Sequence, residues 1–153
     1  MVVGQQCLLD PSRAPAGQAT LWLQLQEVPF APVGDAAAIL KTHQGWTDGL
    51  KHAFLDRVLD RIEQFAPGTR DSVLASEVLS PADLSAENVN AVNGDPYGGS
   101  AELFQNLLWR PFREAANHRN VVKGLWHIGA STHPGAGLSG GSGHLVAQTL
   151  LSK

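Results

Sequence analysis

The chain has 153 residues, a formal net charge of −3 and only 16% charged side chains. Its mildly acidic balance argues against a nucleic-acid partner, because nucleic-acid-binding proteins present a basic face. No apolar run approaches the roughly 18 residues of a transmembrane helix, and the first residues lack the basic region and apolar core of a signal peptide. These features, with a single cysteine, predict a cytoplasmic protein and leave peripheral attachment to a membrane open.

The first third of the chain predicts two strands joined by a turn. Residues 1–9 are rich in apolar side chains, and residues 19–28 alternate between apolar and polar side chains as a half-buried strand does. Between them, residues 10–17 contain Asp-Pro and Pro-Ala-Gly, which are typical of turns. We therefore expect two antiparallel neighbours whose connection is too long for a tight hairpin.

One long amphipathic helix is predicted over residues 48–65, with Thr47 as its N-cap and a Pro-Gly pair after its end. Residues 73–79 are a strand candidate. Ser80 followed by Pro81 begins a further short helix, with proline at its first position. Together with the N-terminal strands, these elements predict an α+β fold on a small, mainly antiparallel or mixed sheet.

The C-terminal stretch combines three elements in series. Residues 125–128 form a short apolar run typical of a buried strand, residues 129–142 a loop rich in Gly, Ser and Thr, and residues 143–151 a predicted helix. A glycine-rich loop that opens a helix N-terminus leaves backbone N–H groups accessible at the positive end of the helix dipole. Such a place binds anions or electron-rich carbonyls. The residues alone leave equally open an ordinary turn between a strand and a helix.

This stretch resembles the last segment of FAD-dependent oxidoreductases related to phytoene (carotenoid) desaturases and amine oxidases, where a strand, an HPGGG-like loop and a final helix close the flavin site. The matching residues are Gly124, Leu125, Gly129, His133, Pro134, Gly135, Gly137, Gly140 and Gly143. Residues 10–17, 72–84 and 101–111 are similar to the family's DPSLAPEG, ARxVLTPADLE and LDQLFFxRP segments. The family's GGDxxHG loop corresponds to residues 93–99, where the histidine is missing and its role cannot be carried over.

The resemblance, which runs through essentially the whole chain, implies a hydride transfer from an apolar or amine-type small molecule to FAD. The expected flavin contacts are Gly129, His133, Pro134, Gly135, Gly137, Leu138, Ser139 and Gly140. The expected substrate-side residues are Tyr97, Phe104 and Trp109, although ordinary core aromatics would satisfy the same pattern. The catalytic residues stay unknown.

Half of an FAD site is missing from this sequence. No strand–GxGxxG–helix unit for the ADP half occurs before residue 124. Residues 135–140 fit GxGxxG, but no second strand or acidic ribose partner follows them. We interpret residues 1–123 as part of a substrate domain and residues 124–153 as the closing segment of an incomplete FAD-binding domain. FAD is expected only in the complete protein, with a missing N-terminal part or a split subunit as partner.

The sequence also allows other functional interpretations. The spacings of His127, His133 and His144 match no compact metal-ligand pattern, so no metal is expected. Ser139 and Ser142 lie near histidines, but no GxSxG elbow accompanies them, which disfavours a hydrolase. The rival function is a stand-alone binding or structural domain that kept the fold without the chemistry. The low charged fraction indicates a hidden surface, which a homodimer would also cover.

Overall fold

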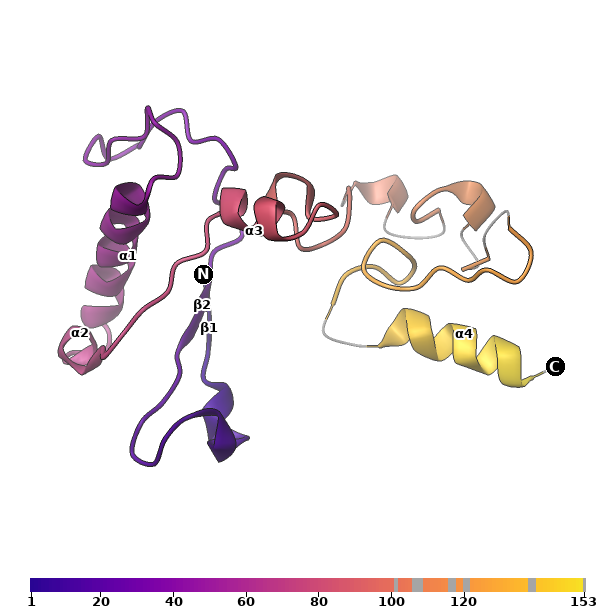
Figure 1. The fold of residues 1–153 in the computed structure, drawn as a ribbon, viewed down its shortest axis with the longest axis horizontal. Helices are drawn as coiled ribbons and strands as arrows, with labels where there is room; N and C mark the ends of the chain where they lie inside the picture. The colour runs from indigo at the N-terminus through magenta and orange to yellow at the C-terminus, as the bar shows by residue number, and fades with distance from the viewer. Residues whose placement is uncertain (101, 106–108, 116–117, 120–121, 138–139, 153) are drawn as a thin grey trace.

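The computed structural model describes residues 1–153 except 101, 106–108, 116–117, 120–121, 138–139 and 153. The chain is elongated and has two lobes (Figure 1). The first lobe holds the N-terminal hairpin and the long helix, and the second holds the C-terminal loops and the last helix. The short helix α3 (Pro81–Glu87) lies between them. The described residues thus confirm an α+β fold with one small antiparallel sheet.

The sheet consists of β1 (Val2–Gly4) and β2 (Trp22–Gln24), which pair antiparallel with Val3 opposite Leu23. The predicted neighbours and their orientation are confirmed, but both strands are much shorter than the predicted ranges. Two single 3₁₀ turns follow β1: η1 (Gln6–Leu8) and η2 (Pro11–Arg13). No described layer packs on the hairpin, and its apolar side chains stay largely exposed. Without a buried face, the alternating pattern does not extend the pairing.

Helix α1 (Asp48–Glu63) forms where the apolar periodicity predicted it and ends two residues before Phe65. The Leu50 amide donates to Thr47 Oγ1 at 3.2 Å, which confirms the N-cap. After the left-handed Gly68, the single-turn helix α2 (Thr69–Ser72) turns the chain back.

The strand predicted over residues 73–79 is wrong. This segment runs from α2 to α3 without regular secondary structure (Figure 1). Val73, Leu74 and Leu79 are exposed. The apolar run therefore marks a surface that no described part of the chain covers, rather than a place in the sheet.

Helix α3 begins as predicted, with Ser80 as N-cap and Pro81 in the first turn. The Asp83 amide donates to Ser80 Oγ at 3.2 Å, and the Ser80 amide donates to the Asp83 carboxylate at 2.8 Å. This reciprocal pair is a capping box. Lys51 Nζ of α1 lies 3.3 Å from Asp83 Oδ2, so the same carboxylate also ties α3 to the first lobe.

Replacing Ser80 with alanine is expected to destabilise the chain by about 1–2 kcal/mol, because the first turn of α3 loses its side-chain cap. Ser80 is only 3% exposed, so water does not replace the lost acceptor easily. Ser85→Ala in the same helix is the control and should change stability by less than about 0.5 kcal/mol. Urea unfolding followed by circular dichroism compares the two variants. Equal effects would contradict the capping role.

The second lobe is mostly irregular chain that ends in helix α4 (Gly141–Leu151). Its shorter elements are η4 (Leu103–Gln105) and η5 (Arg113–Ala115), whereas η3 (Val92–Gly94) packs against α3. The predicted C-terminal helix is confirmed and starts at Gly141 rather than Gly143.

The buried strand predicted over residues 125–128 is wrong. Leu125 and Ile128 are about half exposed, at 50% and 52%. Trp126 forms an isolated antiparallel bridge with Arg119, and no longer strand is described there. A single bridge leaves the apolar run on the surface of the lobe.

The chain exposes an unusually large surface for its mass. Its solvent-accessible area is 11414 Å² at 16.3 kDa, whereas a folded monomer of this mass exposes about 7,500 Å². Among the described residues, the buried hydrophobic side chains are Leu50, Val58, Ala115 and Val146. None of the described helices combines the length and hydropathy needed to cross a membrane.

Candidate functional site

The loop that follows Ile128 folds into consecutive tight turns. The Thr132 side chain, which is 0% exposed, donates to Gly129 O at 2.9 Å. The Gly135 amide donates to Thr132 O at 2.7 Å. Gly129 and Gly135 have φ angles of 112° and 109°, which favour glycine. The backbone path of the loop therefore depends on two glycines that the family resemblance assigns to the expected flavin contacts.

The N-terminus of α4 is joined to the start of this loop. The Gly129 amide donates to Ser142 Oγ at 2.9 Å, and Ser142 is buried. The N-cap residue Gly140 offers no side-chain acceptor, and the first turn of α4 contains no acidic residue. The orphan N–H groups of this turn therefore lack a side-chain cap from the N-cap position. Leu138 and Ser139, also predicted flavin contacts, lie outside the described residues.

Gly140 is a glycine that the described chain itself does not require. Its φ is −76°, which any residue adopts. A Cβ atom built on Gly140 would meet no described atom within 4 Å. The same open space surrounds Gly129. The backbone at both positions is thus open to close approach from outside.

Arg110 packs against the glycine loop, residues 129–135, and is only 5% exposed. Its Nε donates to Ala130 O at 2.9 Å, its Nη1 to Ser100 O at 2.8 Å and its Nη2 to Tyr97 O at 2.7 Å. The guanidinium thus joins the glycine loop to a second loop over residues 95–100. The LDQLFFxRP similarity includes this arginine, but the sequence alone assigned it no role, because its partners are distant along the chain.

The second loop is a compact turn built around Asp95. Its carboxylate accepts from the Tyr97 amide at 2.8 Å and from the Gly99 amide at 3.1 Å. A Cβ atom on Gly98, whose φ is 68°, would lie 3.0 Å from the Ser131 amide nitrogen. Gly98 therefore allows the two loops to touch. It occupies the position where the family's loop has its histidine.

The other predicted site residues do not all gather at this junction. Tyr97 lies in the second loop, and its hydroxyl accepts a hydrogen bond from Gln26 Nε2 of the first lobe. Phe104 and Trp109 are 58% and 48% exposed, so neither is enclosed in a described cavity. His133 is half-buried and precedes Pro134 through a cis peptide bond.

The second lobe also contains a pair of histidines joined through the backbone. The His127 amide donates to His118 O at 2.8 Å, and His118 Nδ1 lies 3.2 Å from His127 O. His127 Nε2 lies 3.2 Å from Ser131 Oγ. These contacts are structural, because they hold His127 against the loop that follows Ile128. Within the described part of the chain, no group of three His, Cys, Asp or Glu side chains could hold a metal ion.

Known proteins match nearly the whole chain. It is 32% identical over 142 residues to a mouse pyridine nucleotide-disulfide oxidoreductase domain-containing protein 2. It is 31% identical over 150 residues to the lycopene-forming phytoene desaturase of a Paracoccus strain and 31% identical over 149 residues to that of Pantoea ananas. These alignments cover 93% to 95% of this chain. The chain is therefore similar to phytoene desaturases over nearly its whole length.

The chain corresponds to only part of these relatives. It spans 23% of the mouse protein and 27% of each of the two desaturases. No family model matches the chain, and no solved structure matches it. The resemblance to the desaturase family that the sequence motifs indicated is confirmed.

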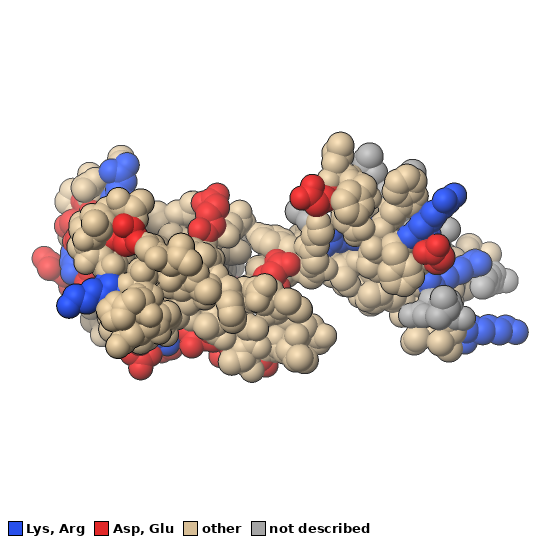
Figure 2. All heavy atoms as spheres, turned by 90° about the horizontal axis from the view of Figure 1, so that it is seen from above, with Lys and Arg blue, Asp and Glu red and all other residues tan. Residues whose placement is uncertain are grey.

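Charge is distributed unevenly over the chain. Residues 95–153 carry five basic and three acidic side chains, whereas residues 1–94 carry six basic and eleven acidic ones. Figure 2 shows acidic side chains spread over the first lobe and basic ones gathered on the second. The lobe that contains the glycine loop is thus the net positive one, which favours anionic ligands over cationic ones there.

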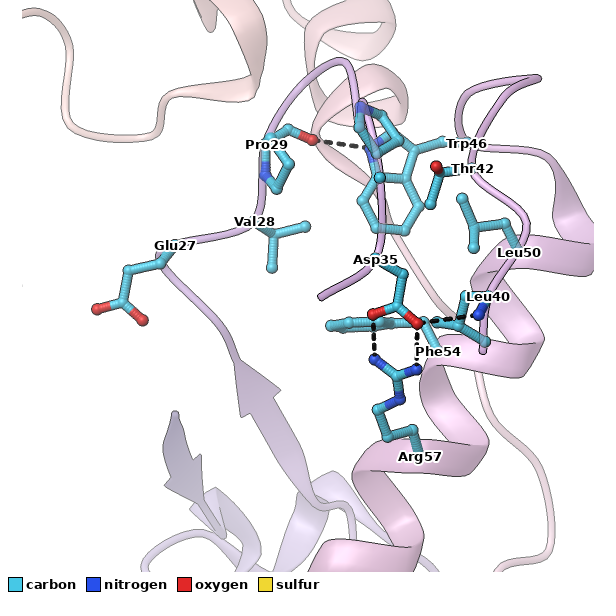
Figure 3. Close-up of a pocket in the computed structure, with 12 residues that line it drawn as sticks. Glu27, Val28, Pro29, Asp35, Leu40, Thr42, Trp46, Leu50, Phe54 and Arg57 are labelled. Carbon is cyan, nitrogen blue, oxygen red and sulfur yellow. Dashed lines mark hydrogen bonds and ion pairs between the residues drawn. The ribbon is translucent and has the colours of Figure 1, made fainter. Parts of the chain in front are cut away.

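A small cavity of about 120 Å³ lies in the first lobe, away from the glycine loop. Its apolar wall includes Trp46 and Phe54, and Asp35 faces Arg57 across its base (Figure 3). Trp46 Nε1 donates to Pro29 O at 2.9 Å and fixes the indole at the rim. None of the predicted site residues lines this cavity. It is smaller than the roughly 300 Å³ at which small-molecule sites begin.

Proposed function

We propose that this chain forms the C-terminal part of an FAD-dependent oxidoreductase and closes the flavin end of its active site. The observation that carries the proposal is a helix N-terminus, at Gly140 and Gly141, whose N-cap residue supplies no side-chain cap, in a chain similar to phytoene desaturases. Glycine at position 140 serves no packing or φ requirement of the described chain. A cofactor that approaches the backbone at this point accounts for it.

The residues present fit a flavin in their chemistry. When bound, FAD supplies a two-electron acceptor for a hydride from a substrate carbon. The backbone N–H groups at the start of α4 and the helix dipole would stabilise negative charge on the pyrimidine end of the flavin. Gly129, Gly135, Gly137 and Gly140 would allow the backbone to approach, and Leu138 and Ser139 stay predicted contacts. We assign the substrate to the apolar or amine-type class.

The proposal requires a second component. The ADP half of FAD needs a strand–GxGxxG–helix unit, which this sequence lacks. The surface excess of roughly 4,000 Å² over a folded monomer of this mass is several times the approximately 800 Å² that each partner buries in a standard interface. We propose that the remaining part of the oxidoreductase, as the same polypeptide or a separate subunit, covers this surface.

A stand-alone binding or structural domain is the alternative, and the absence of a complete dinucleotide-binding unit, with its second strand and acidic ribose partner, from the sequence favours it. The two functions differ in what the chain binds inside its own cell. A tagged chain that recovers a partner with a dinucleotide fold, or that forms part of a longer product with one, supports the oxidoreductase. A chain recovered without any such component, and without flavin, supports the alternative.

Replacing Gly140 with valine is expected to leave the fold intact and to lower FAD retention of the complete assembly at least tenfold, because the side chain projects into the open space at the helix start. Gly34→Val is the control, since Gly34 also has no neighbour within 4 Å and no positive φ. Flavin released by heat denaturation is measured by fluorescence for both variants. Equal FAD content in the two variants would contradict the placement of the flavin at α4.

A further inference from the structure

Arg110 is a buried cation whose described partners are backbone carbonyls. The residue is 5% exposed, and its guanidinium donates to the carbonyls of Tyr97, Ser100 and Ala130 at 2.7, 2.8 and 2.9 Å. Among the described residues, no carboxylate lies within 4 Å of its nitrogen atoms, unlike the paired Arg57. Burying a charge is costly unless strong hydrogen bonds compensate for it. This site therefore requires all three carbonyls to stay in place.

The three carbonyls belong to the two loops that matter for the proposed function. Ala130 lies in the loop that leads to the expected flavin contacts, whereas Tyr97 is an expected substrate-side residue and Ser100 ends the same loop. A guanidinium presents its donors in a rigid planar fork, so it holds both loops in one geometry. A lysine ammonium would reach fewer of these oxygens, because its donors radiate from a single point on a flexible stem.

Two glycines near the guanidinium, Gly98 and Gly135, allow the two loops and Arg110 to lie close together. Gly98 lets the second loop lie against the Ser131 amide, where a Cβ atom would come to 3.0 Å. A Cβ atom on Gly135 would lie 3.9 Å from Arg110 Nε, in ordinary contact. The hydroxyl of Tyr97 continues the connection to Gln26 in the first lobe. A shift of Arg110 would therefore move both loops together.

We propose that Arg110 is a positioning residue that sets the flavin-end loop, residues 129–135, against the substrate-side loop, residues 95–100. The assignment of these two sides rests on the proposed function. Arg110 acts through the backbone of the two loops, which fixes the distance between cofactor and substrate. Its role in the reaction is geometric, and the alignment of reacting atoms is sensitive to small displacements.

The first test needs no flavin and uses the chain itself. Amide hydrogen exchange is measured for the wild type, Arg110→Lys and the control Arg113→Lys, an exposed arginine on the same segment. In Arg110→Lys, the amides of Thr132, Gly135 and Gly99 should exchange about tenfold faster or more, while α1 stays as protected as in the wild type. Unchanged loops, or equal loosening in Arg113→Lys, would overturn the proposal.

The second test separates positioning from simple stability. In the flavin-containing assembly, Arg110→Lys should slow flavin reduction by substrate about tenfold or more and shift the visible flavin spectrum, while Arg113→Lys should do neither. Loosened loops with an unchanged spectrum and reduction rate would make Arg110 a structural residue and overturn the proposal. A wild-type assembly without flavin would contradict the proposed function instead, because the exchange measurement on the loops does not depend on flavin.

Discussion

Replacing Gly94 with alanine is expected to destabilise the chain by about 2–5 kcal/mol. Gly94 is buried at the end of η3, where a Cβ atom would lie 2.4 Å from Pro81 O and 2.5 Å from Pro81 Cα. Backbone atoms cannot rotate away as a flexible side chain can, so η3 must separate from α3. The φ of 75° adds the cost of a left-handed conformation. Urea unfolding followed by circular dichroism measures the loss.

Two other glycines separate the contributions to this loss. Gly17 has a φ of 78° and no neighbour within 4 Å, so Gly17→Ala should show the conformational cost alone, about 1–2 kcal/mol. Gly34 has neither a positive φ nor a neighbour, and Gly34→Ala should be close to neutral. If Gly94→Ala were no worse than Gly17→Ala, the close contact between η3 and α3 would be refuted.

The pair of Asp35 and Arg57 is expected to have the second large effect. The Asp35 side chain is 10% exposed and accepts from both terminal nitrogens of Arg57, at 2.8 and 2.7 Å. It also accepts from the Ile39 and Leu40 amides at 3.0 and 2.9 Å. This carboxylate therefore holds the segment after β2 against α1. Arg57→Met should lower Tm by several degrees, whereas Arg61→Met on the same helix should change it little.

The same pair predicts a dependence of stability on pH. Hydrogen bonds from Arg57, followed by those from the Leu40 amide, hold the pKa of Asp35 well below its ordinary value of 3.8. A group whose pKa is lowered by folding stabilises the folded state above its unfolded pKa. That stability is lost as the pH falls, so Tm should drop between about pH 5 and pH 2.

A comparison of variants tests whether the fall in Tm at low pH comes from the Asp35–Arg57 pair. In Arg57→Met, the drop in Tm over this range should be smaller, because the largest cause of the lowered pKa is gone. Asp48, Glu63 and Asp83 also have lowered pKa values from their own hydrogen bonds, so part of the drop should remain. An identical drop in the wild type and Arg57→Met would contradict the assignment to Asp35.

The helices could be predicted from the sequence because their signals are local. The apolar spacing of α1, the Thr47 cap and the Ser80-Pro81 start each lie within a few residues of the structure they specify. The strands over residues 73–79 and 125–128 were predicted from equally apolar runs, but a strand also needs a pairing partner. No described segment pairs with the first run, and the second forms only an isolated bridge.

Only the part of the candidate site that depends on local sequence could be predicted. The glycine loop and the start of the helix are contiguous in the sequence. Gly129 and Gly135 could therefore be predicted as loop residues, and their positive φ angles agree with this. The role of Arg110 could not, because its partners come from positions 97, 100 and 130. Likewise, the need for glycine at position 98 follows only from its contact with Ser131 of the other loop. Hydrogen bonds between loops depend on the tertiary fold, which no local pattern encodes.

The flavin content of the native assembly tests the central claim most directly. The chain carries a tag, is purified gently from its own organism, and is compared with the isolated chain incubated with FAD. We predict about one FAD per chain in the native assembly, together with a component that carries a strand–GxGxxG–helix unit. The isolated chain should stay colourless. A native assembly without flavin, or an isolated chain that retains stoichiometric FAD, would contradict an FAD site completed by a second component.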